Sequence, residues 1–144
     1  MKRQAFSLVS LLSLLLVTGS AIAQTVNVYA KIPFNFAVGR KTLPAGPYDV
    51  GTIDNGDSTM LLVQFRNGSS AVVVASNAAA NLKPADKTKL VFTRYGNRYF
   101  LSQIWVNGET SGRQLPKTSR EKELARDVAQ NLTRGQVQIV ASLQ

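Results

Sequence analysis

The sequence offers few side chains for chemistry. It contains no histidine and no cysteine, so it lacks the commonest general base, the thiol nucleophile and most transition-metal ligands. We therefore expect no metal site and no cofactor. Paired carboxylates could still hydrolyse a glycoside, because that reaction needs two acidic side chains about 5 to 10 Å apart. The acidic residues are Asp49, Asp54, Asp57, Asp86, Glu109, Glu121, Glu123 and Asp127.

Local structure explains several of these acids without catalysis. Asp54 and Asp57 flank an Asn-Gly turn, and Glu109 follows another. Glu123 lies three residues from an arginine on either side, which is the spacing of a solvated helix face. We predict no catalytic residue. A carboxylate-dependent hydrolase stays as an alternative, and it needs two of these acids in one cleft.

Aromatic and cationic side chains mark a second candidate site, in the stretch KLVFTRYGNRYFLSQIW from Lys89 to Trp105. Gly96-Asn97 suits a two-residue type II′ turn, so the stretch predicts a β-hairpin. Stacking on aromatic faces and attraction to cations would give such a hairpin affinity for sugars or anionic polymers. The candidate ligand-binding residues are Lys87, Lys89, Arg94, Tyr95, Arg98, Tyr99 and Trp105.

The expected register divides this hairpin into core and surface. Phe92 would oppose Leu101, and Phe100 would share a face with Ile104, so these four residues are predicted to be core. The residues predicted at the surface form two opposing pairs near the turn, Arg94 with Tyr99 and Tyr95 with Arg98.

The first 23 residues have the pattern of a secretory signal peptide. Lys2 and Arg3 precede an apolar run from Phe6 to Val17, which is shorter than the ~20 residues needed to span a bilayer. Ala21-Ile22-Ala23 then supplies small residues for cleavage. We predict export to the periplasm or the exterior, and a mature single domain over 24–144 with no transmembrane segment.

The charge balance favours anionic partners. The whole chain carries 17 basic and 8 acidic residues, a net charge of +9. Without Lys2 and Arg3 it carries 17 − 2 = 15 basic residues and a net charge of 15 − 8 = +7. Such an excess attracts anions through the summed surface field. In the cell envelope these would be lipopolysaccharide, an acidic glycan or a cell-wall polymer, and nucleic acid is not expected there.

Turn dipeptides predict a meander of antiparallel strands. Asn55-Gly56 and Asn67-Gly68 favour the type I′ turn, in which both central residues need a positive φ. As two-residue turns they would place Val50 opposite Leu61, and Leu61 opposite Val74. The strand around Leu61 is apolar on both faces, so we expect a central strand covered on each side.

Prolines and polar stretches delimit the other strands. Pro33 interrupts the strand-like run over 26–38, and Pro47 would enter an edge strand, since proline cannot donate to a ladder. The polar stretch from Ser76 to Lys89 is expected to be a connection.

One helix is predicted near the C-terminus, beginning at a capping box formed by Thr118 and Glu121. Gly135 would end it, and the alternating residues 136–143 predict a last strand. The apolar stripe expected to pack on the sheet is Leu124, Val128 and Leu132. The predicted fold is mainly β: a single antiparallel β-sandwich or small barrel with one α-helix before the last strand.

Three segments resemble a family of small secreted proteins of environmental Gram-negative bacteria that has no known activity. They are F-x-V-G-x-x-x-L-P-A-G-x-Y over Phe36–Tyr48, RYG-x-RYFL over Arg94–Leu101, and GRQLP-x-[ST] over Gly112–Thr118. The resemblance covers about Lys31 to Arg126 and implies secretion and one β-rich domain, but no ligand or site. Its members often carry a histidine before RYG, where this chain has Thr93.

The function expected from these patterns is that of a noncatalytic envelope or extracellular β-domain that binds an anionic polymer or glycan. Two alternatives remain. A carrier of small apolar ligands would need an enclosed barrel cavity, and a hydrolase would need the paired acids. The sequence predicts no oligomeric state.

Overall fold

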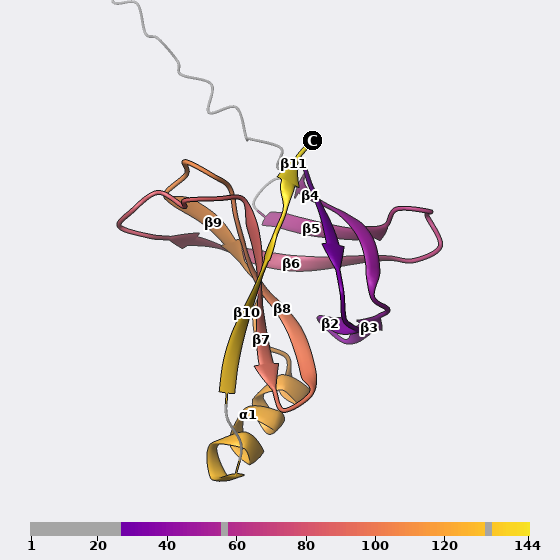
Figure 1. The fold of residues 1–144 in the computed structure, drawn as a ribbon, viewed down its shortest axis with the longest axis vertical. Helices are drawn as coiled ribbons and strands as arrows, with labels where there is room; N and C mark the ends of the chain where they lie inside the picture. The colour runs from indigo at the N-terminus through magenta and orange to yellow at the C-terminus, as the bar shows by residue number, and fades with distance from the viewer. Residues whose placement is uncertain (1–26, 56–57, 132–133) are drawn as a thin grey trace, which may run out of the picture.

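The computed structural model describes residues 27–55, 58–131 and 134–144, so the predicted signal peptide lies outside the described residues (Figure 1). In chain order the elements are β1 (Asn27–Ile32), β2 (Phe36–Val38), β3 (Lys41–Leu43), β4 (Gly46–Asn55), β5 (Ser58–Phe65), β6 (Ala71–Ala80), β7 (Lys89–Tyr95), β8 (Arg98–Trp105), β9 (Ser111–Gln114), α1 (Ser119–Asn131), β10 (Arg134–Val140) and β11 (Ser142–Leu143).

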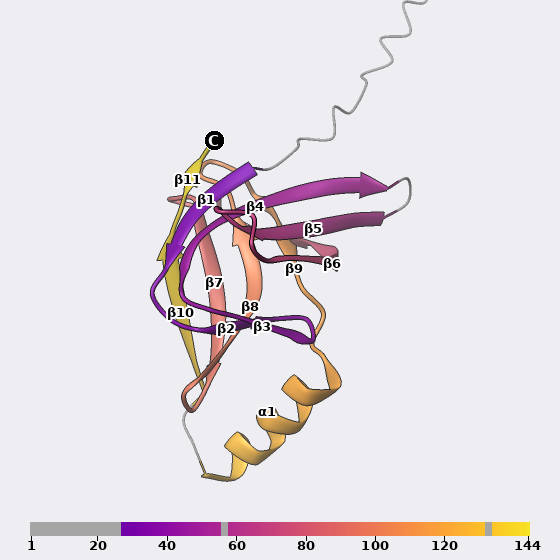
Figure 2. The same cartoon turned by 90° about the vertical axis from the view of Figure 1, so that its right-hand side faces the viewer.

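The strands form one sheet that folds over into a sandwich, in the order β10-β7-β8-β9-β6-β5-β4-β1-β11. At one seam β6 changes partner, since residues 71–76 pair with β5 and residues 77–80 pair with β9. At the other seam β10 pairs with β7, while β11 pairs with β1 (Figure 2). Strands that pass from one layer to the other make the corners of such packings. The prediction of a mainly β, sandwich-like domain with one helix before the last strands is confirmed.

The β2–β3 hairpin lies beside the main path of the sheet. Its strand β2 pairs in parallel with β8 at Ala37 and Phe100, so the sheet is mixed, whereas the sequence predicted antiparallel pairing. The break at Pro33 between β1 and β2 occurs where the sequence predicted it.

Two hairpin registers were predicted correctly and one was not. Leu61 pairs with Val74, and Tyr95 pairs with Arg98. Val50 pairs with Val63 instead of Leu61, because the ladder ends with Asn55 opposite Ser58. A shift of two in the partner keeps the same side chains on the same face of the sheet.

The turn type at Asn67-Gly68 differs from the prediction. No described non-glycine residue has a positive φ, so Asn67 cannot be a central residue of a type I′ turn. Gly68, at φ +77°, donates its N–H to the Phe65 carbonyl at 2.7 Å. Glycine alone therefore supplies the left-handed residue that this turn needs.

Three other expectations about strands are wrong. Strand β4 lies between β1 and β5 and is not an edge strand. Pro47 is tolerated because it lies at the start of β4, where β5 has ended and Arg66 donates its N–H to the Pro47 carbonyl at 3.0 Å. Residues 76–80 belong to β6 and not to a connection. Strand β5 is central, but its second face is uncovered, since Val73 beside it is 52% exposed.

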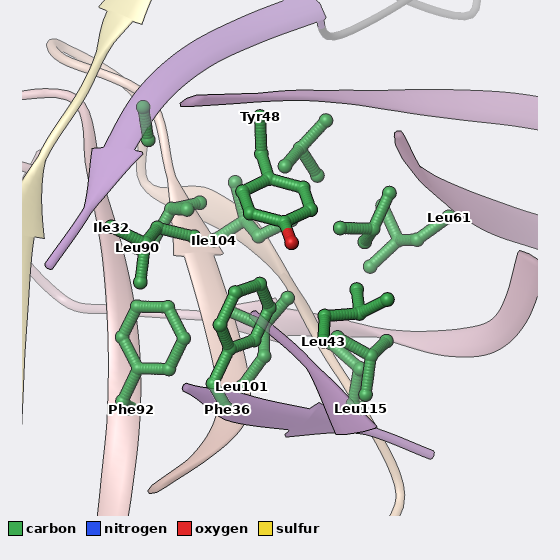
Figure 3. Packing of buried hydrophobic residues seen from close by; sticks show 14 residues of the cluster. Ile32, Phe36, Leu43, Tyr48, Leu61, Leu90, Phe92, Leu101, Ile104 and Leu115 are labelled. Carbon is green, nitrogen blue, oxygen red and sulfur yellow. The ribbon is translucent and has the colours of Figure 1, made fainter. Parts of the chain in front are cut away.

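The space between the two layers is filled by apolar side chains (Figure 3). Phe36 lies in edge-to-face contact with Tyr48 at 5.0 Å and with Phe92 at 5.4 Å between ring centroids. These three side chains are at most 1% exposed. The Tyr48 hydroxyl donates to the Pro44 carbonyl at 2.6 Å, which satisfies the one polar atom that this aromatic group buries.

A β-bulge at Ser102 changes which residues of β8 face inward. Phe92 pairs with Leu101 but Val91 pairs with Gln103, so Ser102 is the extra residue. Its hydroxyl donates to the Val91 carbonyl at 2.9 Å. Leu101 and Ile104 both join the central core, whereas Phe100 lies on the opposite face of the sheet. Phe100 and Ile104 are both buried, as predicted, but they do not share a face.

Within the described ranges, the chain has no helix with the length and apolar character needed to cross a membrane.

Replacing Tyr48 tests the polar contact in the core. We expect Tyr48→Phe to lower the free energy of unfolding by about 1 kcal/mol at pH 7, because the hydrogen bond to Pro44 is lost. Burial also raises the pKa of the Tyr48 phenol. Wild-type stability should therefore fall as the pH rises above about 10, where the unfolded chain ionises this group, and that part of the fall should be absent in Tyr48→Phe. Urea unfolding at pH 7 and pH 10.5 measures both effects, and parallel pH dependences would contradict the second.

Candidate anion-binding cleft

The seven candidate residues do not form one surface. Lys89 pairs with Trp105 at one end of the β7–β8 hairpin, and Tyr95 pairs with Arg98 at the other. The six residue steps between these pairs span roughly 20 Å along a strand. Different segments cover the outer face at each end: the connection over 81–88 and helix α1.

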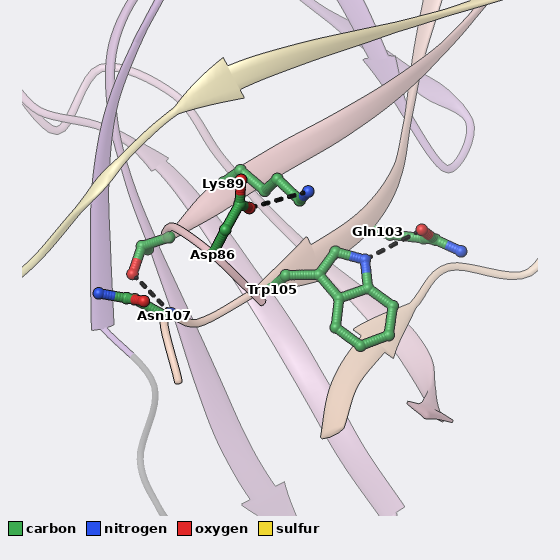
Figure 4. A network of polar contacts seen from close by, with 6 residues as sticks. Asp86, Lys89, Gln103, Trp105 and Asn107 are labelled. Atoms are coloured by element: carbon green, nitrogen blue, oxygen red, sulfur yellow. Dashed lines mark hydrogen bonds and ion pairs between the residues drawn. The ribbon is translucent and has the colours of Figure 1, made fainter. Parts of the chain in front are cut away.

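The end of the hairpin near Trp105 is a closed structural cluster (Figure 4). Trp105 is only 4% exposed, and its indole Nε1 donates to Gln103 Oε1 at 3.0 Å. The Lys89 ammonium lies 3.6 Å from the Asp86 carboxylate. Trp105 is therefore not available for stacking on a ligand, contrary to prediction, and Lys89 already has an anionic partner. Lys87 is exposed in the neighbouring connection.

Tyr95, at the other end, is also buried where the sequence predicted exposure. It is 2% exposed, its ring contacts Phe100 edge-to-face at 5.7 Å, and Leu124 of α1 packs against the pair. The Tyr95 hydroxyl donates to Glu121 Oε1 at 3.2 Å. Helix α1 covers this part of the sheet and turns a predicted surface residue into core. Arg94 and Arg98 are exposed, and Tyr99 is half-buried.

The beginning of α1 follows part of the predicted capping box. The Thr118 hydroxyl accepts a hydrogen bond from the Glu121 N–H at 3.2 Å. The Glu121 side chain is 6% exposed, and its carboxylate accepts the Tyr95 bond under the helix. Of the predicted apolar stripe, Leu124 packs on the sheet. The Val128 side chain and Leu132 lie outside the part that the structure describes.

A cleft of about 590 Å³ lies between the β2–β3 hairpin, the start of β8 and the start of α1. Three arginines from three separate segments, Arg40, Arg98 and Arg120, are on its wall. We refer to it as the arginine cleft. Its other lining residues are Asn35, Phe36, Ala37, Gly39, Thr42, Asn97, Tyr99, Phe100, Thr118 and Ser119.

The aromatic part of the arginine cleft is held in place by the core. Tyr99 stacks on Phe34 with ring centroids 3.9 Å apart and an interplanar angle of 16°. Phe34 in turn makes an edge-to-face contact with Phe92 at 5.1 Å. Phe36 and Phe100 are almost fully buried beneath the cleft. The core packing therefore holds these segments in place, and Phe36 and Phe100 themselves leave almost no aromatic surface exposed to a ligand.

The electrostatics of the arginine cleft are strongly positive. None of its lining residues is acidic, and neither ion pair found among the described residues involves Arg40, Arg98 or Arg120. The nearby Glu121 is turned away and bonded to Tyr95. The cleft also lies at the N-terminal end of α1, where the helix dipole favours negative charge. Planar guanidinium groups bind carboxylate, sulfate or phosphate oxygens with paired hydrogen bonds.

The sequence identified Arg98 and Tyr99 of this site and missed Arg40 and Arg120. Arg94 was predicted but is not among the lining residues. A signal was present, because the three segments that carry the family resemblance all contribute to the cleft. Phe36–Tyr48 supplies Arg40, Arg94–Leu101 supplies Arg98, and Gly112–Thr118 ends two residues before Arg120.

A second cleft of about 650 Å³, lined by Asp54 and Glu109 among others, contains two acids. Asp54 is exposed and accepts a hydrogen bond from the Thr59 hydroxyl at 3.1 Å. The hydrolase alternative required two acids in one cleft, and this cleft meets that condition. No group of three or more acidic side chains that could hold a metal ion occurs in the described residues.

Comparison of the chain with protein-family models, with curated proteins and with solved structures finds no match. The assignment of a function therefore depends on the geometry of the clefts.

The helix that borders the arginine cleft depends on its cap. We expect Thr118→Ala to lower the free energy of unfolding by about 1 kcal/mol, because the Glu121 N–H loses its acceptor. Amide hydrogen exchange in α1 should be faster in Thr118→Ala than in the wild type. Exchange in β7 should be unchanged, since the loss is local. Thr118→Ser keeps the hydroxyl and should behave as wild type. Equal exchange rates in the Ala and Ser variants would show that this cap does not hold the helix.

Proposed function

We propose that this protein is an exported, noncatalytic β-domain that binds an anionic glycan or polymer segment in the arginine cleft. The observation that carries the proposal is the convergence of Arg40, Arg98 and Arg120 on one cleft with no acidic lining residue. Three cations that line one cleft repel one another, so a site of this kind gains stability from a bound anion.

The size and lining of the arginine cleft fit an acidic sugar. Its volume of about 590 Å³ lies within the usual range of small-ligand sites. Asn35, Asn97 and Thr42 add neutral donors and acceptors at the wall. The chemistry of recognition would be guanidinium to carboxylate, sulfate or phosphate, with hydroxyl contacts at the side.

The net charge of the chain supports the same proposal. Without Lys2 and Arg3 of the predicted signal peptide, the net charge is 15 − 8 = +7. An exported protein of this charge would attract acidic polymers of the envelope over a distance set by ionic strength. The cleft would then select the group that is bound. Binding should therefore weaken as the salt concentration rises. The contacts inside the arginine cleft should persist to higher salt than the long-range attraction.

The other two hypotheses have less support. A carrier of apolar ligands needs an enclosed cavity, but the space between the layers is occupied by the aromatic and aliphatic core. A hydrolase needs one acid that donates a proton and one that acts as base or nucleophile. Asp54 and Glu109 share a cleft with one arginine, Arg113. The Arg113 guanidinium already donates to the Ser76 hydroxyl at 3.0 Å and to the Ser76 carbonyl at 2.6 Å.

Two arginines of one hairpin give a matched test of the binding site. We expect Arg98→Ala to weaken binding of a heparin tetrasaccharide by at least about tenfold, because each charge-assisted hydrogen bond contributes roughly 1.5 to 3 kcal/mol. Arg40→Ala and Arg120→Ala should have similar effects. Isothermal titration calorimetry at 50 mM and 150 mM salt measures the affinity.

Arg94→Ala is the control. It removes the same charge from an exposed position on the same hairpin, opposite Tyr99 but outside the cleft lining. Its effect should be less than about threefold, as expected for general electrostatics. Equal losses for Arg94→Ala and Arg98→Ala would show that the cleft is not the site. No binding of heparin, oligogalacturonate or lipopolysaccharide by the wild type would reject the proposed function.

The second cleft gives a test of the noncatalytic assignment. We expect no release of reducing ends from oligogalacturonate, chitin oligomers or peptidoglycan by the wild type. Should hydrolysis be detected and then lost in both Asp54→Asn and Glu109→Gln, the protein would be a carboxylate-dependent hydrolase instead.

A further inference from the structure

Strand β6 has an open edge in its first half. Residues 71–76 pair with β5 on one side, and only residues 77–80 pair with β9 on the other. The side opposite β5 therefore has no partner strand over residues 71–75 among the described strands. Open edges are normally blocked by charges, prolines or bulges, because they pair with other chains.

The pairing of β6 with β5 and with β9 shows toward which side each residue of β6 directs its backbone N–H and C=O groups. Phe65 donates its N–H to the Ser70 carbonyl at 2.8 Å, so Val72, Val74 and Ser76 point their backbone groups toward β5. Their odd-numbered neighbours must point the other way. The pairing of β6 with β9 follows the same alternation, because the odd-numbered Asn81 donates its N–H to the Thr110 carbonyl on the β9 side at 2.8 Å.

The odd-numbered residues of the open edge are Ala71, Val73 and Ala75. The Ala71 carbonyl accepts a long hydrogen bond of 3.4 Å from Lys41 Nζ. The backbone groups of Val73 and Ala75 have no partner on the open side within the described part of the chain. Each can donate one hydrogen bond and accept at least one more.

The sequence of this edge is symmetric about its centre. It reads Ala-Val-Val-Val-Ala over residues 71–75, so it is identical in both directions. An antiparallel pair of such strands would meet at Val73, with Ala71 opposite Ala75 of the second strand. Because Val73 points its backbone groups to the open side, Val73 and its copy would form a hydrogen-bonded pair, as this register requires.

The edge strand itself carries no charge. Residues 67–82 form an uncharged stretch between Arg66 and Lys83, so two copies of β6 can pair without placing like charges of the two strands opposite one another. Arg40 and Lys41 of the β2–β3 turn line the cleft beside this edge. Lys41 lies beside Ala71 at the end of the edge, away from the symmetry point at Val73.

The surroundings of the edge are apolar and accessible. Val73 is 52% exposed, and Ile53 on the same outer face is 42% exposed. A surface cleft of about 520 Å³ runs along the edge, lined by Val72 to Ala75, by the β2–β3 turn, and by Leu115, Pro116 and Thr118 between β9 and α1. Pairing would join the two uncovered outer faces into one larger apolar surface.

We propose that the protein forms a symmetric dimer in which β6 pairs with β6 of a second copy about a two-fold axis at Val73. Three opposing residue pairs would exchange about six backbone hydrogen bonds, and the sheet would continue across the two molecules. The interface is isologous, because each copy presents the same strand to the other.

Charge exchange at Val73 tests this register directly. Light scattering coupled to size exclusion should give twice the monomer mass for the wild type at 100 µM. Val73→Lys and Val73→Glu should each be monomeric, because the axis places two like charges opposite one another. An equimolar mixture of the two variants should regain the doubled mass as a heterodimer. Only a contact of residue 73 with residue 73 gives this pattern.

Two further variants separate loss of pairing from loss of fold. Val73→Pro removes an N–H that the monomer does not use, and proline is tolerated on the open side of an edge strand, so it should be folded but monomeric. Val73→Thr keeps the N–H and should dimerise. Circular dichroism should be unchanged in both, because Val73 is exposed in the monomer.

The proposal fails if the wild type is monomeric at 100 µM, since the edge then has another occupant or none. It also fails if a dimer forms but persists in Val73→Lys, or if mixing the two charged variants gives no heterodimer. These outcomes are independent of the proposed glycan binding, which the Arg98→Ala and Arg94→Ala comparison tests separately.

Discussion

The contact of Phe36 with two aromatic rings is the interaction on which the rest of the structure depends. Tyr48 belongs to one layer of the sandwich and Phe92 to the other, and Phe36 of the short strand β2 touches both rings edge-to-face. A strand of three residues has too few backbone hydrogen bonds to be stable alone. Burial of Phe36 therefore fixes the β2–β3 hairpin against the sandwich, and with it the position of Arg40. With no cysteine in the chain, this burial takes the place of a covalent link.

The two layers differ in how their outer faces are used. Behind β7 and β8, α1 and the connection over 81–88 cover the aromatic side chains, and the border of α1 with the sheet leaves the arginine cleft. Behind β5 and β6 no described segment covers Val73 or Ile53. The two proposed interaction surfaces are neighbours, because Gly39, Arg40 and Thr118 line both the arginine cleft and the cleft beside the open edge of β6.

The parts of the fold that the sequence predicted are those that depend on near neighbours. Gly96-Asn97 predicted the β7–β8 turn and its register, since a two-residue turn leaves the strands one way to pair. Proline at position 33 predicted the break after β1. The errors arose where a distant segment intervened: Tyr95 carries a polar hydroxyl near a turn, which suggests exposure, but α1 from more than twenty residues away covers it and Glu121 accepts its hydrogen bond.

By itself, the sequence determined the β class, the single helix with its Thr118 cap, and a chemistry limited to carboxylates, arginines and aromatic rings. These properties follow from composition and from apolar residues that recur every two or four positions. Such patterns depend only on residues that are close together in the sequence. The tertiary structure alone decided that Arg40, Arg98 and Arg120 share a cleft, because 58 and 22 residues separate them along the chain. It also decided which edge of β6 stays open. Both results depend on how the sheet folds over, and this is set by the sum of many packing contacts and not by any local pattern.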